Sequence, residues 1–489
     1  MQNPNLQAML EKEQKRNENN KIMNRPVVVV SYVFALIFFA MIGYLVYFMA
    51  VDATGIIANS ANKRQDSFAD KVIRGQIITS DGEVIAETKV SKSGEESRKY
   101  PYDEMFAHVV GYTRYGKSGL ELEGNYYLLT STANIFERVY HTLKEEKNIG
   151  DNVISTLDYD MQKAAYNALK GVQGAIVVME PDTGKILAMV SKPDFDPNDI
   201  EAVWEKAMAS SSSESMLLNR ATQGRYAPGS TFKILTALEY IRENNDYVSY
   251  EYDCESEGVF DSVSIHCAKG QTHGKVTLAE TLALSCNTSV ANIGTKINIQ
   301  KLHDLCESFL FNHNLPYNGV YNPSSFLLDG DSEAFDVPQT VIGQGDTTIS
   351  PLHNAMIIST IANGGIMMKP YLIDSIENYE GARVKKFTSS SYGRIITTEE
   401  AKALSKMLED VVKDGTATKY LGDCKYSVAG KTGTAEYGND GNVNSWFIGY
   451  SNVEKPDIVV SILIEDADTV GVKAANVARK LFDAYYKDN

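Results

Sequence analysis

The sequence predicts an α+β protein in which one antiparallel sheet is flanked by helices. A small β-rich N-terminal domain and one transmembrane helix precede it. Three observations support this prediction. Apolar strand pairs occur near residue 180 and near the C-terminus, helical patterns fill the segment between them, and a long uncharged run lies close to the N-terminus. Strands at both ends of a segment with helices between them are typical of a single sheet that helices cover.

The uncharged run covers 26 residues, from Pro26 to Val51. A bilayer core of about 30 Å requires only about 20 helical residues, so this run is long enough to span a membrane. The sequence around Val51 is a poor cleavage site, which indicates a retained anchor rather than a signal peptide. Five basic residues against three acidic ones precede the run, which predicts a cytoplasmic N-terminus and an extracellular remainder.

Four regions are therefore expected. Residues 1–25 form a cytoplasmic tail, of which the polar residues 1–24 lack regular structure. Residues 26–51 form the transmembrane anchor, residues 52–150 the β-rich domain and residues 151–489 the second domain. In the β-rich domain, a strand, an Asp-Gly turn and a strand over residues 76–86 predict a hairpin.

The second domain carries the elements of the predicted sheet. Residues 160–169 have helical periodicity, and strands at 174–180 and 185–191 flank a Pro-Asp-Thr-Gly turn. Two more buried strands are predicted at 445–450 and 457–464, followed by a helix over 471–486.

A serine and a lysine three residues apart, Ser230 and Lys233, begin an apolar helical pattern. Pro228-Gly229 breaks the chain just before, so Ser230 is expected in the first helical turn. Residues i and i+3 share a helix face, so the Lys233 amine is placed to take the proton of the Ser230 hydroxyl. By itself this pattern is weak, because roughly two copies are expected by chance in a chain of this length. An ordinary helix with a solvated lysine is the simpler alternative.

Two further motifs favour the catalytic interpretation. Ser285-Cys286-Asn287 lies downstream, and Lys431-Thr432-Gly433-Thr434 follows a short apolar approach. A chance Lys-Thr-Gly has a probability of only about 0.1 in such a chain. The order of the three motifs follows that of penicillin-binding proteins and class A β-lactamases. For Ser285 and Asn287 the simpler alternative is a capping or packing role.

With these motifs the chain resembles the class B penicillin-binding proteins, the peptidoglycan D,D-transpeptidases, in their short form. The resemblance covers roughly residues 55–485, and its fold is that of the transpeptidases and serine β-lactamases. Other segments similar to the family are Asn59, Asn62 and Arg64, Arg74–Gly82 with Thr79 in place of the usual Asp, Tyr100-Pro101, Gly119–Glu121, Gly343–Gly345 and Trp446–Gly449.

The resemblance implies a mechanism and a role for each site residue. Ser230 would attack the penultimate D-alanine of a stem peptide with Lys233 as base, and β-lactams would trap the acyl-enzyme. Ser285 would relay the proton, and Asn287 would bind Lys233 and the substrate backbone. Lys431, Thr432 and Thr434 would hold the substrate carboxylate, Gly433 would allow close approach of the ligand, and the N–H groups of Ser230 and Thr434 would form the oxyanion hole. A charge on Lys431 would also lower the pKa of Lys233.

The resemblance also implies what the chain lacks and what it binds. No glycosyltransferase domain fits before residue 150, so a separate membrane glycosyltransferase of the SEDS type is the expected partner. The region 52–150 would be the pedestal that holds the second domain away from the membrane. A D,D-carboxypeptidase remains an alternative because it differs only in using water as the acceptor. A β-lactamase and a penicillin-sensing receptor fit the chain less well.

Composition excludes other classes. A net charge of −16 argues against nucleic acid binding. Five cysteines lie in the exported part, and Cys254 and Cys267 are spaced to close a disulfide loop contributing about 3 kcal/mol. Cys286 is expected to be a packed apolar residue. Without Cys-x-x-Cys or His-Glu-x-x-His patterns, the sequence predicts no metal site and no cofactor.

Overall fold

The computed structural model describes residues 4–49, 69–144, 146–209, 216–438 and 441–487. The chain forms two compact units, Met1–Gln65 and Asp66–Asn489. Asn59, Asn62 and Arg64, which resemble a family motif, lie outside the described residues, as do Ala50 and Val51 at the end of the predicted anchor.

The first unit contains one long helix, α1 (Pro4–Tyr47), whose apolar part is exposed along its length. By length and composition this helix can cross a membrane. Its uncharged part, residues 26–47, is about 33 Å long at about 1.5 Å per residue, which matches a bilayer core. The expectation that residues 1–24 lack regular structure is wrong for residues 4–24, which are helical. They are rich in Leu, Met, Gln, Glu and Lys, which favour helix, and these residues continue the helix of the apolar run.

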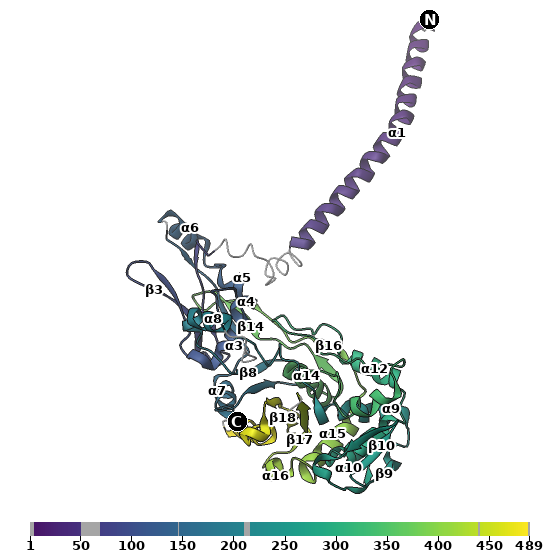
Figure 1. The fold of residues 1–489 in the computed structure, drawn as a ribbon. Helices are drawn as coiled ribbons and strands as arrows, with labels where there is room; N and C mark the ends of the chain where they lie inside the picture. Colours follow the sequence, from purple (N-terminus) through teal and green to yellow (C-terminus); the bar gives the residue numbers. More distant parts are fainter. Residues whose placement is uncertain (1–3, 50–68, 145, 210–215, 439–440, 488–489) are drawn as a thin grey trace. The chain divides into compact units, whose positions relative to one another are not determined.

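A five-stranded antiparallel sheet forms the centre of the second unit (Figure 1). Its strands run in the spatial order β17 (Val428–Tyr437), β18 (Asn442–Ser451), β19 (Ile458–Ile464), β7 (Gly174–Met179) and β8 (Ile186–Lys192). Strands from the two ends of the domain therefore pair with each other, as the sequence predicts. The register joins Ile462 of β19 to Ile176 of β7.

Helices cover both faces of this sheet. Every residue of β7 and β19 is buried. Alternate residues of β19, from Ile458 to Ile464, join an apolar core completed by α7 (Tyr159–Ala168) and α18 (Ala474–Lys487). Helix α14 (Pro351–Ala362) also packs against β7, β18 and β19. The predicted helices over 160–169 and 471–486 are thus confirmed to within a few residues.

A lobe beside the sheet edge contains the segments that carry two of the three motifs (Figure 1). It includes helices α9 (Lys233–Glu243), α10 (Leu278–Ala283) and α11 (Asn287–Gly294) and the short strands β9 (Glu251–Cys254), β10 (Glu257–Phe260), β11 (Val263–His266) and β12 (Gly274–Thr277). Helix α15 (Thr398–Lys413) packs against both α10 and β17, so it connects this lobe to the sheet.

A second, six-stranded sheet combines distant parts of the chain. Its order is β15 (Arg383–Lys386), β14 (Ile373–Glu377), β6 (Asn152–Ser155), β2 (Ile77–Ile78), β3 (Val84–Val90) and β4 (Glu96–Lys99). The predicted hairpin is confirmed, since β2 and β3 pair antiparallel. Thr79 closes its turn, because its hydroxyl accepts a 2.9 Å hydrogen bond from the Glu83 N–H. The sequence assigns β14 and β15 to the second domain, yet they complete the sheet of the first.

Shorter elements fill the remaining connections. The other helices are α3 (Ala107–Val110), α4 (Gly119–Glu123), α5 (Asn125–Leu128), α6 (Ile135–Leu143), α8 (Ile200–Ala209), α12 (Ile299–Ser308), α13 (Val337–Thr340), α16 (Thr418–Leu421) and α17 (Ala467–Val470). The strand pairs β1 (Val72–Ile73) with β5 (Asn148–Ile149) and β13 (Ile366–Met368) with β16 (Ser391–Arg394) complete the described elements.

A buried ion cluster joins three segments of the N-terminal region. Glu121 is fully buried, and its carboxylate accepts hydrogen bonds of 2.6 Å from Arg74 Nε and 2.7 Å from Arg98 Nε. Tyr100 donates to the same carboxylate at 3.2 Å. Burial alone would raise the pKa of Glu121, but the two guanidinium groups hold it below its ordinary value. The motif segments that contain Arg74, Tyr100 and Glu121 therefore meet at one structural site.

Replacing this glutamate should destabilise the protein. We expect Glu121→Ala to lower the free energy of unfolding by about 3–5 kcal/mol, because it leaves two buried guanidinium groups without their partner. Thermal unfolding of the full chain in detergent measures the effect. Glu87→Ala is the matched control, since the half-buried Glu87 pairs with the exposed Lys89 at the protein surface. Equal stability of the two variants would contradict a structural role for the cluster.

Candidate active site

Ser230 lies in a tight turn that leads directly into a helix. The turn is a 3-10 helix, Gly229–Thr231, and α9 begins at Lys233. Phe232 between them has φ −64° and ψ −27°, so the helical conformation is continuous. Ser230 is half-buried, whereas α9 is buried from Lys233 to Tyr240. The predicted placement of Ser230 in the first helical turn is confirmed.

The Lys233 side chain is fully buried and ends between two residues of the second motif. Its Nζ donates hydrogen bonds of 2.8 Å to the carbonyl oxygen of Ser285 and 2.5 Å to Oδ1 of Asn287, with the Ser285 hydroxyl at 3.4 Å. The predicted contact between Asn287 and Lys233 is confirmed. The contact between Lys233 and the Ser230 hydroxyl stays a prediction.

Burial lowers the pKa of Lys233 to about 8. Burial also lowers the pKa of Lys431 well below its ordinary value, and the charge of Lys233 lowers it further. Burial lowers the pKa of Lys233, and the expected lowering by a charge on Lys431 is not found; the charge of Lys233 lowers the pKa of Lys431 instead. A pKa near 8 leaves an appreciable neutral fraction of Lys233 at physiological pH, which a proton acceptor requires.

Ser285 occupies a strained position between α10 and α11. Its φ is +59°, in the left-handed region that non-glycine residues rarely adopt. Such a conformation costs on the order of 1 kcal/mol and persists where the surrounding structure enforces it, often at functional sites. Here the strain brings both the carbonyl and the hydroxyl of Ser285 to Lys233.

Asn287 links the lysine to a neighbouring loop. While its Oδ1 accepts from Lys233, its Nδ2 donates a 2.8 Å hydrogen bond to the carbonyl oxygen of His266. Both ends of this amide are therefore held by the protein. The capping role that was the simpler alternative for Asn287 falls instead to Cys286, whose Sγ accepts from the N–H of Ser289 at 3.4 Å.

The third motif lies on β17, the edge strand of the five-stranded sheet. Lys431 is fully buried and donates a 3.1 Å hydrogen bond to the carbonyl oxygen of Thr432. Thr432 is half-buried and Thr434 is exposed. The hydroxyls of Thr432 and Thr416 lie 2.5 Å apart. In this motif, solvent therefore reaches the side chains of Thr432 and Thr434 but not that of Lys431.

Two glycines allow β17 to pack tightly against the turn that carries Ser230. A Cβ on Gly433 would lie 2.9 Å from Cβ of Trp446 and 3.1 Å from Cγ2 of Thr231. Gly229 has φ +53°, and a Cβ there would lie 2.4 Å from the carbonyl oxygen of Thr434. Gly433 thus packs closely against Trp446 and the turn before α9, and its predicted role in close approach of a ligand stays a prediction.

The three motifs meet at a cleft of about 700 Å³. Its lining includes six of the eight predicted site residues, namely Ser230, Ser285, Asn287, Thr432, Gly433 and Thr434. The other two, Lys233 and Lys431, are fully buried. The Ser230 side chain and the edge of β17 therefore line one cleft, and the Lys233 amine is buried behind the Ser285 and Asn287 part of its wall, an arrangement that suits acyl transfer.

Sequence reasoning missed several residues of this cleft. Thr416 and the loop formed by residues 266–273 also line it. Thr416 belongs to none of the three motifs. The loop lies between the short strands β11 and β12 and has no apolar periodicity of its own. Only its cysteine and its two histidines are potential metal ligands.

All five cysteines are free in the structure. The sulfur atoms of Cys254 and Cys267, the pair that the sequence spaces for a disulfide, lie 3.6 Å apart. Cys286 is fully buried, as expected.

Comparison with known proteins finds a matching family and several relatives. It matches the family described as penicillin binding protein transpeptidase domain over residues 174–483 and the penicillin binding protein A dimerisation domain over residues 74–153. The peptidoglycan D,D-transpeptidase PbpA of Mycolicibacterium smegmatis is 30% identical over 476 residues, covering 89% of this chain and 94% of that protein. MrdA of Acinetobacter baumannii, also a peptidoglycan D,D-transpeptidase, is 26% identical and covers 79% and 66%.

Solved structures agree. The imipenem acyl-enzyme complex of penicillin-binding protein A from M. tuberculosis is 27% identical with a TM-score of 0.76, covering 85% of this chain and 99% of that one. The D,D-transpeptidase domain of a peptidoglycan glycosyltransferase from Eggerthella lenta is 30% identical with a TM-score of 0.75, covering 85% and 99%.

The close packing around Gly433 generates a prediction. Gly433→Ala should lower the free energy of unfolding by about 1–3 kcal/mol, because the added methyl group overpacks the contact with Trp446 and Thr231. Thermal unfolding checks this effect. Gly330→Ala is the control, since the methyl group there meets only the side chain of Gln300. A Gly433→Ala variant as stable as this control would show that the strand and the turn separate easily.

Proposed function

This chain belongs to the class B penicillin-binding proteins, and we propose that it is a peptidoglycan D,D-transpeptidase whose nucleophile is Ser230. The observation that carries the proposal is the hydrogen bonding of the buried Lys233 amine to Ser285 and Asn287 at the cleft that Ser230 lines. The named relatives PbpA and MrdA are D,D-transpeptidases, and the M. tuberculosis relative forms an acyl-enzyme with imipenem.

The first step is acylation. Ser230 Oγ attacks the carbonyl carbon of the penultimate D-alanine as neutral Lys233 takes the hydroxyl proton. The bond between that carbon and the terminal D-alanine nitrogen breaks, and the proton passes through the Ser285 hydroxyl to the leaving amine. The proximity of Ser285 Oγ to Lys233 Nζ supports this route. The product is an ester on Ser230 and free D-alanine.

The β17 edge supplies the binding groups. The hydroxyls of Thr432 and Thr434 would bind the terminal carboxylate of the substrate, with Lys431 contributing charge from its buried position. The backbone N–H groups of Ser230 and Thr434 would stabilise the oxyanion, each donor contributing about 3 kcal/mol in the transition state. The tight packing of Gly229 against the backbone of Thr434 supports this pairing.

Deacylation by an amine completes the reaction. The amine of a neighbouring stem peptide attacks the ester, a new amide cross-link forms, and Ser230 regains its proton. Water as the acceptor would make the enzyme a carboxypeptidase, but the relatives PbpA and MrdA are D,D-transpeptidases, which favours the transpeptidase. A β-lactam acylates Ser230 in the same way and leaves a stable ester.

The N-terminal part sets the cellular location. The apolar helix α1 and the membership in this family indicate a membrane-anchored protein. The distribution of basic residues supports a cytoplasmic N-terminus, with the pedestal (residues 52–150) and the transpeptidase domain (residues 151–489) outside. A separate SEDS-type glycosyltransferase would supply the glycan strands. Co-purification in mild detergent that never recovers such a polymerase would count against this partner.

Loss of the nucleophile or the base should abolish labelling. We expect Ser230→Ala to lose covalent benzylpenicillin labelling, and Lys233→Ala to slow it by about 10²–10⁴-fold because proton abstraction is lost. Intact-mass time courses of the full chain in detergent measure both. Ser249→Ala and Lys301→Ala, at exposed sites, are the matched controls. Labelling of Lys233→Ala at the wild-type rate would remove Lys233 from the mechanism.

The pH dependence of acylation should follow Lys233. Because its pKa is lowered to about 8, the neutral fraction and the acylation rate constant should rise about tenfold per pH unit below that value and level off above it. Stopped-flow acylation by a chromogenic cephalosporin measures the profile. A rate constant that does not change as the pH approaches 8 from below would mean that Lys233 is not the base.

A further inference from the structure

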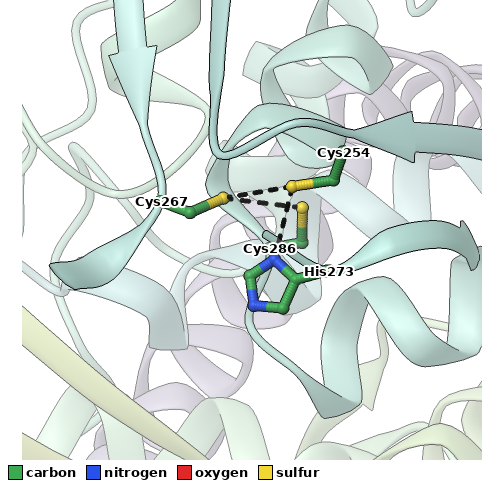
Figure 2. A group of neighbouring side chains, drawn as sticks. All are labelled: Cys254, Cys267, His273 and Cys286. Atoms are coloured by element: carbon green, nitrogen blue, oxygen red, sulfur yellow. Dashed lines mark hydrogen bonds between the residues drawn. The ribbon is translucent and has the colours of Figure 1, made fainter. Parts of the chain in front are cut away.

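Four metal-ligand side chains meet next to the cleft (Figure 2). They are Cys254, Cys267, His273 and Cys286, and their ligand atoms all lie within 4.8 Å of one another. The three cysteines are buried and His273 is half-buried. They come from the end of β9, the residue after β11, the residue before β12 and the N-cap of α11.

The spacing of these atoms matches a tetrahedral site. With metal–sulfur bonds of about 2.3 Å, sulfurs at two corners of a tetrahedron lie about 3.8 Å apart, and a sulfur and a nitrogen about 3.6 Å apart. Here Cys267 Sγ lies 3.6 Å from Cys254 Sγ and 3.7 Å from Cys286 Sγ, and His273 Nδ1 lies 3.4 Å from Cys254 Sγ. These three distances match the edges of a tetrahedral zinc site, and the other donor pairs lie within 4.8 Å.

We propose that Cys254, Cys267, His273 and Cys286 bind a structural zinc ion. Three sulfurs and one imidazole nitrogen form a donor set that selects zinc over the oxygen-preferring calcium and magnesium. A disulfide between Cys254 and Cys267 is the alternative, but it would not explain why Cys286 and His273 also lie within 4.8 Å of these sulfur atoms. Sequence inspection predicts no metal site because the ligands are separated by twelve, five and twelve residues rather than by two.

Neighbouring donors support the sulfurs as thiolates. The Ser289 N–H donates to Cys286 Sγ at 3.4 Å, and the Thr288 hydroxyl donates to Cys254 Sγ at 3.2 Å. Hydrogen bonds of this kind orient metal ligands and offset their negative charge. Cys286 lies at the N-terminus of α11, where the helix dipole also favours a thiolate.

The ion would hold the residues around Lys233 in place. Cys286 stands between Ser285 and Asn287, both of which accept hydrogen bonds from Lys233 Nζ. Cys267 follows His266, whose carbonyl accepts from Asn287 Nδ2. The part of the cleft wall formed by residues 266–273 contains two of the proposed zinc ligands, Cys267 near its start and His273 at its end. The four ligands are therefore positioning residues, and the ion touches no substrate.

Metal content tests the site without reference to catalysis. We expect the full chain, purified in detergent without chelators, to contain one zinc ion per chain. Inductively coupled plasma mass spectrometry measures this content. Cys254→Ser and His273→Ala should lose it, whereas Cys424→Ser and His313→Ala, outside the cluster, should retain it. Zinc that persists in both ligand variants, or a Cys254–Cys267 disulfide found by non-reducing peptide mapping of the metal-free protein, would overturn the proposal.

Cobalt spectroscopy keeps the proposal testable even if a ligand variant fails to fold. The wild-type chain loaded with Co²⁺ should show a thiolate-to-cobalt charge-transfer band and the intense visible bands of tetrahedral coordination. Bands typical of octahedral oxygen coordination, or no cobalt uptake by the reduced protein, would overturn it.

The effect on the reaction rests on the proposed function and is measured separately. Chelation of the zinc should slow benzylpenicillin acylation of Ser230 by at least about tenfold, the size of effect seen when groups around metal sites are disturbed. Readdition of zinc should restore the rate. A zinc-containing chain whose acylation is unchanged by chelation would overturn the positioning role, and a zinc-containing chain that is never acylated would argue against the proposed function alone.

Discussion

Burial of the Lys233 amine is the constraint on which the active site depends. An ammonium or amine removed from water must find acceptors inside the protein. Lys233 finds them in the carbonyl of Ser285 and the side chain of Asn287. This requirement explains why Ser285 holds a left-handed conformation between two helices and why Asn287 is anchored at its other end to His266. The same burial gives the lysine a pKa at which it can act as a base.

Close packing of backbones sets the geometry on the other side of the cleft. Gly229 and Gly433 remove the side chains that would separate β17 from the turn carrying Ser230. Ser230 and the edge of the sheet thereby line one cleft of about 700 Å³. Because β17 is an edge strand, its backbone groups and threonine hydroxyls are available to an extended peptide substrate. The absence of a side chain at these two glycines therefore allows the close packing that places both walls of the cleft.

Two clusters of polar side chains join segments that are distant from one another in the chain. The Arg74–Glu121–Arg98 cluster joins segments of the N-terminal region. The six-stranded sheet includes β14 and β15, which come from much later in the chain. Beside Asn287, four segments of the chain meet at a second cluster, which consists of Cys254, Cys267, His273 and Cys286. Both clusters rely on long-range contacts between polar groups, whose burial costs free energy unless every member finds a partner.

Local patterns in the sequence determined most of the elements and the identity of the site. Apolar runs beside turn residues predicted β7, β8, β18 and β19, helical patterns predicted α7 and α18, and an Asp-Gly turn predicted the β2–β3 hairpin. Each of these signals lies within a short segment of the chain. The order of three short motifs predicted eight site residues, of which six line the cleft. Tertiary structure alone decided that Lys431 is buried, that Gly433 packs against Trp446, that β14 and β15 join the first sheet, and that three cysteines and a histidine converge. These outcomes depend on contacts between residues far apart in the chain, and local periodicity carries no information about such contacts.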